Sequence, residues 1–188
     1  MENSIHGVNG GNHLKERSKR ELISWIQSLA IAFVVAIVIR QFLFTPVIVS
    51  GQSMEPTFEN ENKIVISKIH KINRFDMIVF HAPNSDEDFI KRVIGLPGDV
   101  VVMKDDKLYI NGEEYEEDYI QVNKDKVFEG QKLTQDFKVE VPEGHLYVLG
   151  DNRRHSTDSR ELGVIDEKSV VGAVAFKFYP FRDIGIPK

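Results

Sequence analysis

The chain has 188 residues, no cysteine and a formal net charge of −5. The absence of cysteine excludes disulfide bonds, thiol catalysis and thiolate-bound metals. Acidic residues outnumber basic ones, 29 to 24, and the excess lies beyond residue 40. This balance argues against a nucleic-acid partner, because binding to phosphate backbones needs clustered cations.

Residues 1–21 form a polar segment, which we expect to be a disordered tail. Its basic residues gather between positions 15 and 20, just before an apolar run, whereas only Arg40 stands between that run and Lys63. Because positively charged flanks stay on the cytoplasmic side of a membrane, this asymmetry predicts a cytoplasmic tail. Everything beyond Arg40 is then extracytoplasmic.

The apolar run at residues 22–39 contains no charged residue. As a helix it spans about 27 Å, which suffices to cross the hydrocarbon core of a bilayer. The alternatives are a cleaved secretory signal and a buried helix of a soluble protein. A signal has a shorter apolar region, about 7–15 residues, which soon ends in small residues. We therefore predict a retained single-pass transmembrane helix at residues 22–40, with self-cleavage near Val49 left open.

Residues 41–188 have the length of one compact domain. Apolar residues recur with a period of two, which is typical of strands with one buried face. Turn signals support this prediction: Asn111-Gly112 favours a hairpin, and Pro97-Gly98 has the order preferred in a type II turn. We therefore predict a mainly β domain, with strands at residues 64–69, 77–80, 89–94, 100–103, 108–110, 137–141, 145–149 and 172–179.

Ser53 lies in the segment SGQSMEPT (50–57), close to the predicted membrane surface, and is a candidate nucleophile. A serine hydroxyl needs a base to take its proton. Lys91 is one candidate, because alternation along residues 89–94 places it on the same face as Phe89 and Val93. Burial among apolar neighbours disfavours the ammonium form and can produce the neutral amine that a general base requires. The plainer alternative is a lysine that merely reaches water from a strand.

Histidine is the more common base, and four histidines lie in the predicted domain. A Ser-His-Asp arrangement is therefore a second hypothesis, since triad members need not be neighbours in sequence. The local pattern does not choose between lysine and histidine. The four candidates are His70, His81, His145 and His155, the last of which is close to Asp158.

A polar loop at residues 150–160 follows an apolar strand. If the loop is extended, Asp158 and Arg160 project to the same side and can form an ion pair, while Ser156 can hydrogen-bond a neighbour. An ordinary solvated loop is the alternative. The acidic stretches at 86–88 and 113–118 lack the spacing of a calcium loop and are expected to be solvated surface. We expect no cofactor and no metal.

Three segments together resemble the type I signal peptidases, membrane-anchored serine endopeptidases that remove signal peptides. Residues 53–57 (SMEPT) are similar to the family's nucleophile box, residues 91–99 (KRVIGLPGD) to its lysine box, and residues 150–160 to its last box. Their order and their position after an anchor also agree. The short connection between the last two boxes resembles the compact enzymes of Gram-positive bacteria.

The resemblance implies an antiparallel β-sheet catalytic domain at residues 41–188, of the kind shared with the self-processing SOS-response repressors. It implies a Ser/Lys dyad, in which Ser53 attacks the scissile carbonyl and Lys91 accepts its proton. It also implies that Ser156 hydrogen-bonds the Lys91 amine and that Asp158 and Arg160 form a supporting ion pair. The expected function is signal-peptide removal at the outer face of the cytoplasmic membrane, with exported preproteins and membrane lipid as partners.

Family members accept small residues at the first and third positions before the cut, so the resemblance also implies small pockets with apolar walls. Residues 49–51 are expected to pair with an extended substrate. Residues 42–44 and Phe58 are candidates for contact with lipid, although core packing is the safer interpretation for each. The expected substrate-binding residues are Val49, Gly51, Met54, Phe89 and Ile90.

Two positions depart from the family's pattern. Gly51 replaces a serine that donates to the oxyanion in some members, so the oxyanion hole must use backbone N–H groups. Phe75 stands where the family often has glycine, and we interpret it as structural. Two other hypotheses remain: a self-processing protease related to the SOS repressors, which lacks their DNA-binding segment, and a non-catalytic anchored β domain.

Overall fold

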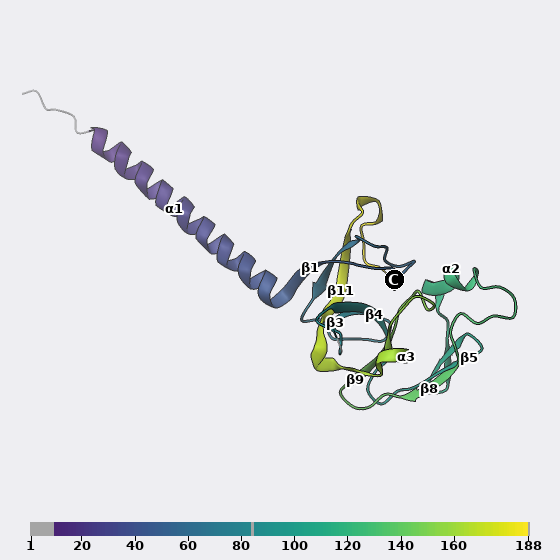
Figure 1. Cartoon of the computed structure of the whole chain (residues 1–188). Coiled ribbons are helices and arrows are strands. Elements are labelled where there is room, and N and C mark those ends of the chain that lie inside the picture. Colours follow the sequence, from purple (N-terminus) through teal and green to yellow (C-terminus); the bar gives the residue numbers. More distant parts are fainter. Residues whose placement is uncertain (1–9, 84, 188) are drawn as a thin grey trace, which may run out of the picture. The chain divides into compact units, whose positions relative to one another are not determined.

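The computed structural model describes residues 10–83 and 85–187. Its internal contacts divide the chain into two compact units, with the boundary between Phe42 and Leu43. The first unit is helical and the second is built from strands (Figure 1).

The first unit is the helix α1 (Gly10–Val38), which continues as the π-helical turn η1 (Ile39–Leu43). The stretch from Lys19 to Leu43 is long and apolar enough to cross a membrane. Its large side chains are exposed, Trp25 among them. The predicted disordered tail is wrong for residues 10–20, because extending an existing helix costs much less than nucleating one. Residues 1–9 lie outside the described residues.

The second unit contains two antiparallel sheets (Figure 1). The larger sheet has the strand order β1-β2-β11-β3-β4-β9-β10. Its strands are β1 (Phe44–Ile48), β2 (Lys63–Ser67), β3 (Met77–His81), β4 (Asp88–Gly95), β9 (His145–Leu149), β10 (Ile165–Asp166) and β11 (Val170–Tyr179). The smaller sheet has the order β7-β6-β5-β8 and lies between β4 and β9 in the sequence. Its strands are β5 (Val100–Lys104), β6 (Lys107–Ile110), β7 (Glu113–Tyr115) and β8 (Phe137–Glu140).

Short helical turns connect several strands. They are η2 (Asp118–Ile120), α2 (Gln121–Lys124), α3 (Ser159–Leu162), η3 (Glu167–Ser169) and η4 (Phe181–Asp183). Of these, α2 follows the smaller sheet's edge strand and α3 closes the polar loop after β9. Both therefore lie in segments that lead toward the candidate site.

Every strand that the sequence predicts is present, with ends shifted by at most two residues. Both turn predictions are also confirmed. Asn111 and Gly112 have φ of 54° and 88°, the left-handed conformation of a two-residue hairpin turn between β6 and β7. Gly98 has φ of 82°, and the N–H of Asp99 donates to the carbonyl of Leu96 at 3.0 Å, which closes the other turn.

Three strands were not predicted: β1, β7 and β10. β1 contains Pro46, which usually argues against a strand, but β1 lies at the edge of its sheet, where a missing N–H is tolerated. β7 is acidic and short, and β10 has only two residues. Strands this short carry too few side chains to show a period of two.

Buried apolar side chains form three clusters, which fix the strands around the site. One cluster joins the loop after β1 to one face of the larger sheet, through Met54, Phe58, Ile64 and Val79. The second cluster joins the two sheets, and the third covers the opposite face of the larger sheet. Phe58 is fully buried, so it belongs to the core and does not contact lipid.

Candidate active site

Ser53 lies in the loop that connects β1 to β2. The N–H of Phe58 donates to the carbonyl of Met54 at 2.9 Å, and both side chains are buried beneath the loop. The N–H of Asn152 donates to the Ser53 carbonyl at 3.0 Å. The nucleophile candidate is thus held from below by apolar packing and from the side by the polar loop after β9.

Lys91 lies on β4, and its side chain is almost completely buried, with 3% exposed. Its Nζ donates to Ser53 Oγ at 2.8 Å and to the carbonyl of Ile90 at 2.9 Å. Burial lowers the pKa of Lys91 to about 8, while the charges of Asp158 and Asp151 act in the opposite direction. A buried amine within hydrogen-bond distance of a hydroxyl, and with a pKa near the working pH, has the properties of a general base.

The polar loop at residues 150–160 is organised around Asp158, whose side chain is fully buried. Its carboxylate accepts from the Gly150 N–H at 2.9 Å and from the Ser156 hydroxyl at 2.8 Å. Arg160 binds it in a bidentate ion pair, with Nε at 2.8 Å and a terminal nitrogen at 2.7 Å. Burial alone would raise the pKa of Asp158, but Arg160 and these hydrogen bonds lower it below its usual value.

Ser156 does not hydrogen-bond Lys91, which corrects one expectation. Its hydroxyl donates to Asp158, because an ionised carboxylate is a stronger acceptor than an amine. Lys91 has two acceptors in the described part of the chain, the Ser53 hydroxyl and the Ile90 carbonyl. Ser156 therefore influences Lys91 only indirectly, because its hydroxyl holds the Asp158 carboxylate in place.

Gly150 lies against both Ser53 and Ser156. A Cβ added there would overlap the Ser156 side chain and would lie 2.6 Å from the Ser53 carbonyl. Glycine at this position therefore allows the two loops to touch.

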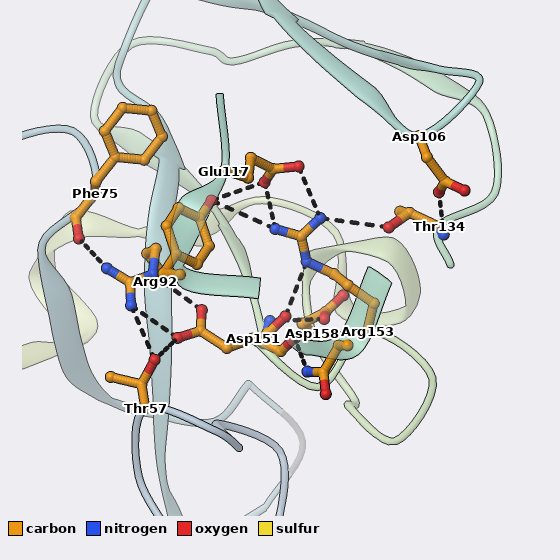
Figure 2. Close-up of polar contacts among 12 residues, drawn as sticks. Thr57, Phe75, Arg92, Asp106, Glu117, Thr134, Asp151, Arg153 and Asp158 are labelled. Carbon is orange, nitrogen blue, oxygen red and sulfur yellow. Dashed lines mark hydrogen bonds and ion pairs between the residues drawn. The ribbon is translucent and has the colours of Figure 1, made fainter. Parts of the chain in front are cut away.

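Two buried ion pairs support the site, and the sequence did not reveal them (Figure 2). Arg92, on the face of β4 opposite Lys91, binds Asp151 through Nε at 2.9 Å and a terminal nitrogen at 2.7 Å. Arg153 binds Glu117, and both side chains have at most 1% exposure. Glu117 lies just after the smaller sheet, so this pair fastens that sheet to the loop of Asp158.

Asn123 of α2 is a further link that the sequence did not predict. Its amide donates to the carbonyls of Glu55 at 2.9 Å and Asp151 at 3.1 Å. One side chain thus joins the loop of Ser53 to the loop of Asp158. Nothing in the local sequence signals this role, because both partners are backbone carbonyls far away in the chain.

A cleft of about 310 Å³ leads to Ser53 and Lys91. Four of the expected substrate-binding residues line it, namely Val49, Gly51, Phe89 and Ile90. Met54 does not line it: its side chain is 1% exposed and packs in the core beneath the loop. The cleft is further lined by Ile64, Val79, Asp88, His155 and Thr157, none of which was among the expected substrate-binding residues.

No histidine is hydrogen-bonded to Ser53 within the described residues. His70 and His81 contact Asp76 and Asp88, and His145 contacts the Glu143 carbonyl. His155 lines the cleft without forming a pair with Asp158. The geometry therefore favours lysine over a Ser-His-Asp arrangement. Residues 10–83 and 85–187 also hold no cluster of three His, Asp or Glu residues suited to a metal ion.

Phe75 has φ of 70°, in the left-handed region that favours glycine. Its ring packs against Tyr115 and Tyr119, with centroids 5.7 and 6.2 Å apart, and its carbonyl accepts from Arg92 at 3.0 Å (Figure 2). Ring packing offsets the backbone strain. The interpretation of Phe75 as structural agrees with these contacts.

Comparisons with known proteins agree with this architecture. A family model described as "Signal peptidase, peptidase S26" matches residues 22–179. The chain is 44% identical over 173 residues to signal peptidase I of Bacillus licheniformis, which covers 88% of this chain and 93% of that protein. It is 39% identical over 180 residues to signal peptidase IB of Staphylococcus aureus, with the same coverage of 88% and 93%. A crystal structure of a signal peptidase I from Enterococcus faecalis V583 matches with a TM-score of 0.56 and 43% identity, over 57% of this chain and 99% of that one.

Proposed function

The chain belongs to the signal peptidase family, peptidase S26, and we propose that it removes signal peptides from exported preproteins with a Ser53/Lys91 dyad. The observation that carries this proposal is the 2.8 Å hydrogen bond between Lys91 Nζ and Ser53 Oγ, made by a lysine that burial has shifted toward the neutral form.

Catalysis begins with neutral Lys91, which accepts the proton of the Ser53 hydroxyl as Oγ attacks the scissile carbonyl. The resulting ammonium then donates a proton to the leaving amine, and an acyl-serine remains. Water, deprotonated by the same amine, hydrolyses that ester and regenerates both side chains. The backbone N–H of Ser53 has no acceptor in the described part of the chain, and we assign it to the oxyanion.

Substrate binds as an extended strand between β1 and β4. The N–H of Val49 donates to the Asn62 carbonyl, and the Val49 carbonyl accepts from the Glu61 N–H. Because backbone groups point alternately to the two sides of an extended segment, those of Ile48 and Ser50 face the cleft. Residues 49–51 follow β1, which ends at Ile48, and we add Ile48 to the segment proposed to pair with substrate. On the other side, β4 pairs with β9 only from Arg92 onward, which leaves the edge at residues 88–91 free.

The apolar walls are compatible with the preference for small residues before the cut that the family resemblance implies. The apolar residues that line the cleft include Val49, Phe89, Ile90, Ile64 and Val79. A small side chain fits such a pocket, whereas a larger one would have to displace packed core residues.

The apolar helix supplies the membrane anchor. We assign residues 22–40 to the bilayer, residues 1–21 to the cytoplasm and the catalytic domain, residues 41–188, to the outside, because basic residues precede the apolar span. Anchor and cleft then act on a substrate whose own signal peptide lies in the same membrane.

The test is cleavage of a purified preprotein by the full chain in lipid vesicles, with the new N-terminus sequenced. Wild type should cut after the signal peptide and Ser53→Ala should not. Ser169→Ala, which changes a serine in η3 that does not line the cleft, is the matched control and should cut normally. Cleavage by Ser53→Ala at the wild-type rate would refute the assignment, and an inactive wild type would favour a non-catalytic anchored domain.

A further inference from the structure

A second cavity adjoins the candidate active site. It has a volume of about 470 Å³ and lies over the polar loop after β9. His155 and Thr157 line both this cavity and the cleft of Ser53. The two hollows therefore lie next to each other at these residues, and we call the second one the loop cavity.

The register of the sheet shows which end of the cleft the loop cavity continues. Leu149, the last residue of β9, pairs with Arg92 of β4. The loop that follows Leu149 thus begins beside Lys91, whereas Asp88 and Ile48 mark the opposite end of the cleft. Ser53 and Lys91 lie at the loop end, so the apolar walls extend mainly to one side of them. A peptide that fills those walls before the cut therefore continues past Ser53 toward the loop cavity.

The arginines that line the loop cavity are not all paired with a carboxylate. Arg153 is buried against Glu117, and Arg160 is bound to Asp158, so both are neutralised. Arg154 is exposed, and its guanidinium donates through one terminal nitrogen to Gln131 Oε1 at 2.9 Å and to the Lys132 carbonyl at 3.1 Å.

These two acceptors of Arg154 are neutral, so they orient the cation without cancelling its charge. Within the described residues no carboxylate binds Arg154. Glu161 is the one lining carboxylate and has no cationic partner there.

We propose that the loop cavity is the site for the first residues after the cut and that Arg154 makes it selective for an acidic side chain there. This inference rests on the proposed function, because it concerns the substrate of that same site. The held guanidinium offers its remaining donors to a carboxylate, for which a planar fork is well suited. Glu161 opposes that selectivity by repelling the same carboxylate.

The expected effect is modest, because Arg154 is solvent-exposed. Exposed ion pairs correspond to about a 1.5- to fivefold change in an equilibrium or a specificity ratio. The preference should also shrink with added salt, since exposed charges are screened. A role of Arg154 in folding alone would predict neither the sign of the preference nor its salt dependence.

The experiment compares preproteins that share one signal peptide and differ by a single Glu, Gln or Lys at each of the first four positions after the cut. The quantity measured is the ratio of kcat/KM for the Glu substrate to that for the Gln substrate, with the full chain in vesicles of neutral lipid. We expect wild type to prefer Glu at one or two adjacent positions by about 1.5- to fivefold at low salt.

Variants assign the preference to individual side chains. Arg154→Gln should bring the Glu-to-Gln ratio to about one, and Glu161→Gln should increase that ratio. Arg154→Glu should bring the ratio below one and make the Lys substrate the preferred one. Arg182→Gln removes an exposed arginine outside the loop cavity and should leave the ratio unchanged.

The inference is overturned if wild type shows no preference at any of the four positions, or if Arg154→Gln retains it. Either result leaves the proposed function standing, provided that wild type cleaves these substrates and Ser53→Ala does not. If wild type cleaves none of the substrates, the proposed function fails and the inference fails with it.

Discussion

Replacing Lys91 by methionine should change how the stability of the β unit depends on pH. Methionine keeps the length of the side chain and removes its charge. The pKa of Lys91 falls from 10.5 to about 8 on folding, because burial disfavours the ammonium form. Between these two values the unfolded chain binds more protons than the folded chain, so the free energy of unfolding of wild type rises with pH.

The size of this effect follows from the shift. Each pKa unit corresponds to about 1.4 kcal/mol, so the buried ammonium costs wild type about 3 kcal/mol at pH 7. Most of that cost disappears by pH 10. The difference in unfolding free energy between Lys91→Met and wild type should therefore decrease by about 2–3 kcal/mol from pH 7 to pH 10.

Urea unfolding of the full chain in mild detergent measures this difference. Circular dichroism is the suitable signal, because Trp25, the chain's one tryptophan, lies in α1 and does not report on the strands. Lys168→Met, at an exposed lysine, controls for the loss of one charge. A difference between Lys91→Met and wild type that stays constant from pH 7 to pH 10 would refute the depressed pKa.

Three further substitutions test the supports of the site. Gly150→Ala should lower kcat by up to about 100-fold with the protein still folded, because the added methyl displaces Ser53 from Ser156. Single-turnover cleavage measures this loss. An unchanged kcat would contradict the close contact of Gly150 with these two serines. Glu117→Gln leaves Arg153 buried without its counter-charge and should reduce stability by about 3–5 kcal/mol in urea unfolding, whereas a loss below about 1 kcal/mol would mean that water reaches the arginine. Asn123→Ala removes two hydrogen bonds between the site loops and should cost about 1–3 kcal/mol of stability. It should also lower kcat more than it raises KM. A larger change in KM than in kcat would show that Asn123 acts on substrate binding instead.

The sequence predicted those features that depend on near neighbours along the chain. Alternating apolar residues located the long strands, and Asn111 and Gly98 located two turns. Alternation along β4 also separated Lys91 from Arg92, and the structure sends these side chains to Ser53 and Asp151 respectively. The Asp158–Arg160 pair was predictable for the same reason, since two residues in an extended segment point to one side.

What the sequence did not predict depends on tertiary contacts. Asn123 acts through backbone carbonyls, which carry no side-chain signature. Glu117 belongs to an acidic stretch whose composition predicts solvated surface, yet folding buries its side chain against Arg153. Met54 follows Ser53 directly, but the turn directs its side chain into the core. Local pattern does not determine where such side chains point once the two sheets have packed.

The proposed mechanism requires that Lys91 is the base that activates Ser53. The pH dependence of kcat/KM for preprotein cleavage tests this most directly, because that profile reports the titration of the free enzyme's essential groups. We predict that wild-type activity rises through an apparent pKa of about 8 and that Lys91→Arg, whose guanidinium stays charged, is inactive at every pH. A profile that rises instead near 6.5, the ordinary pKa of histidine, or an active Lys91→Arg enzyme, would contradict the dyad.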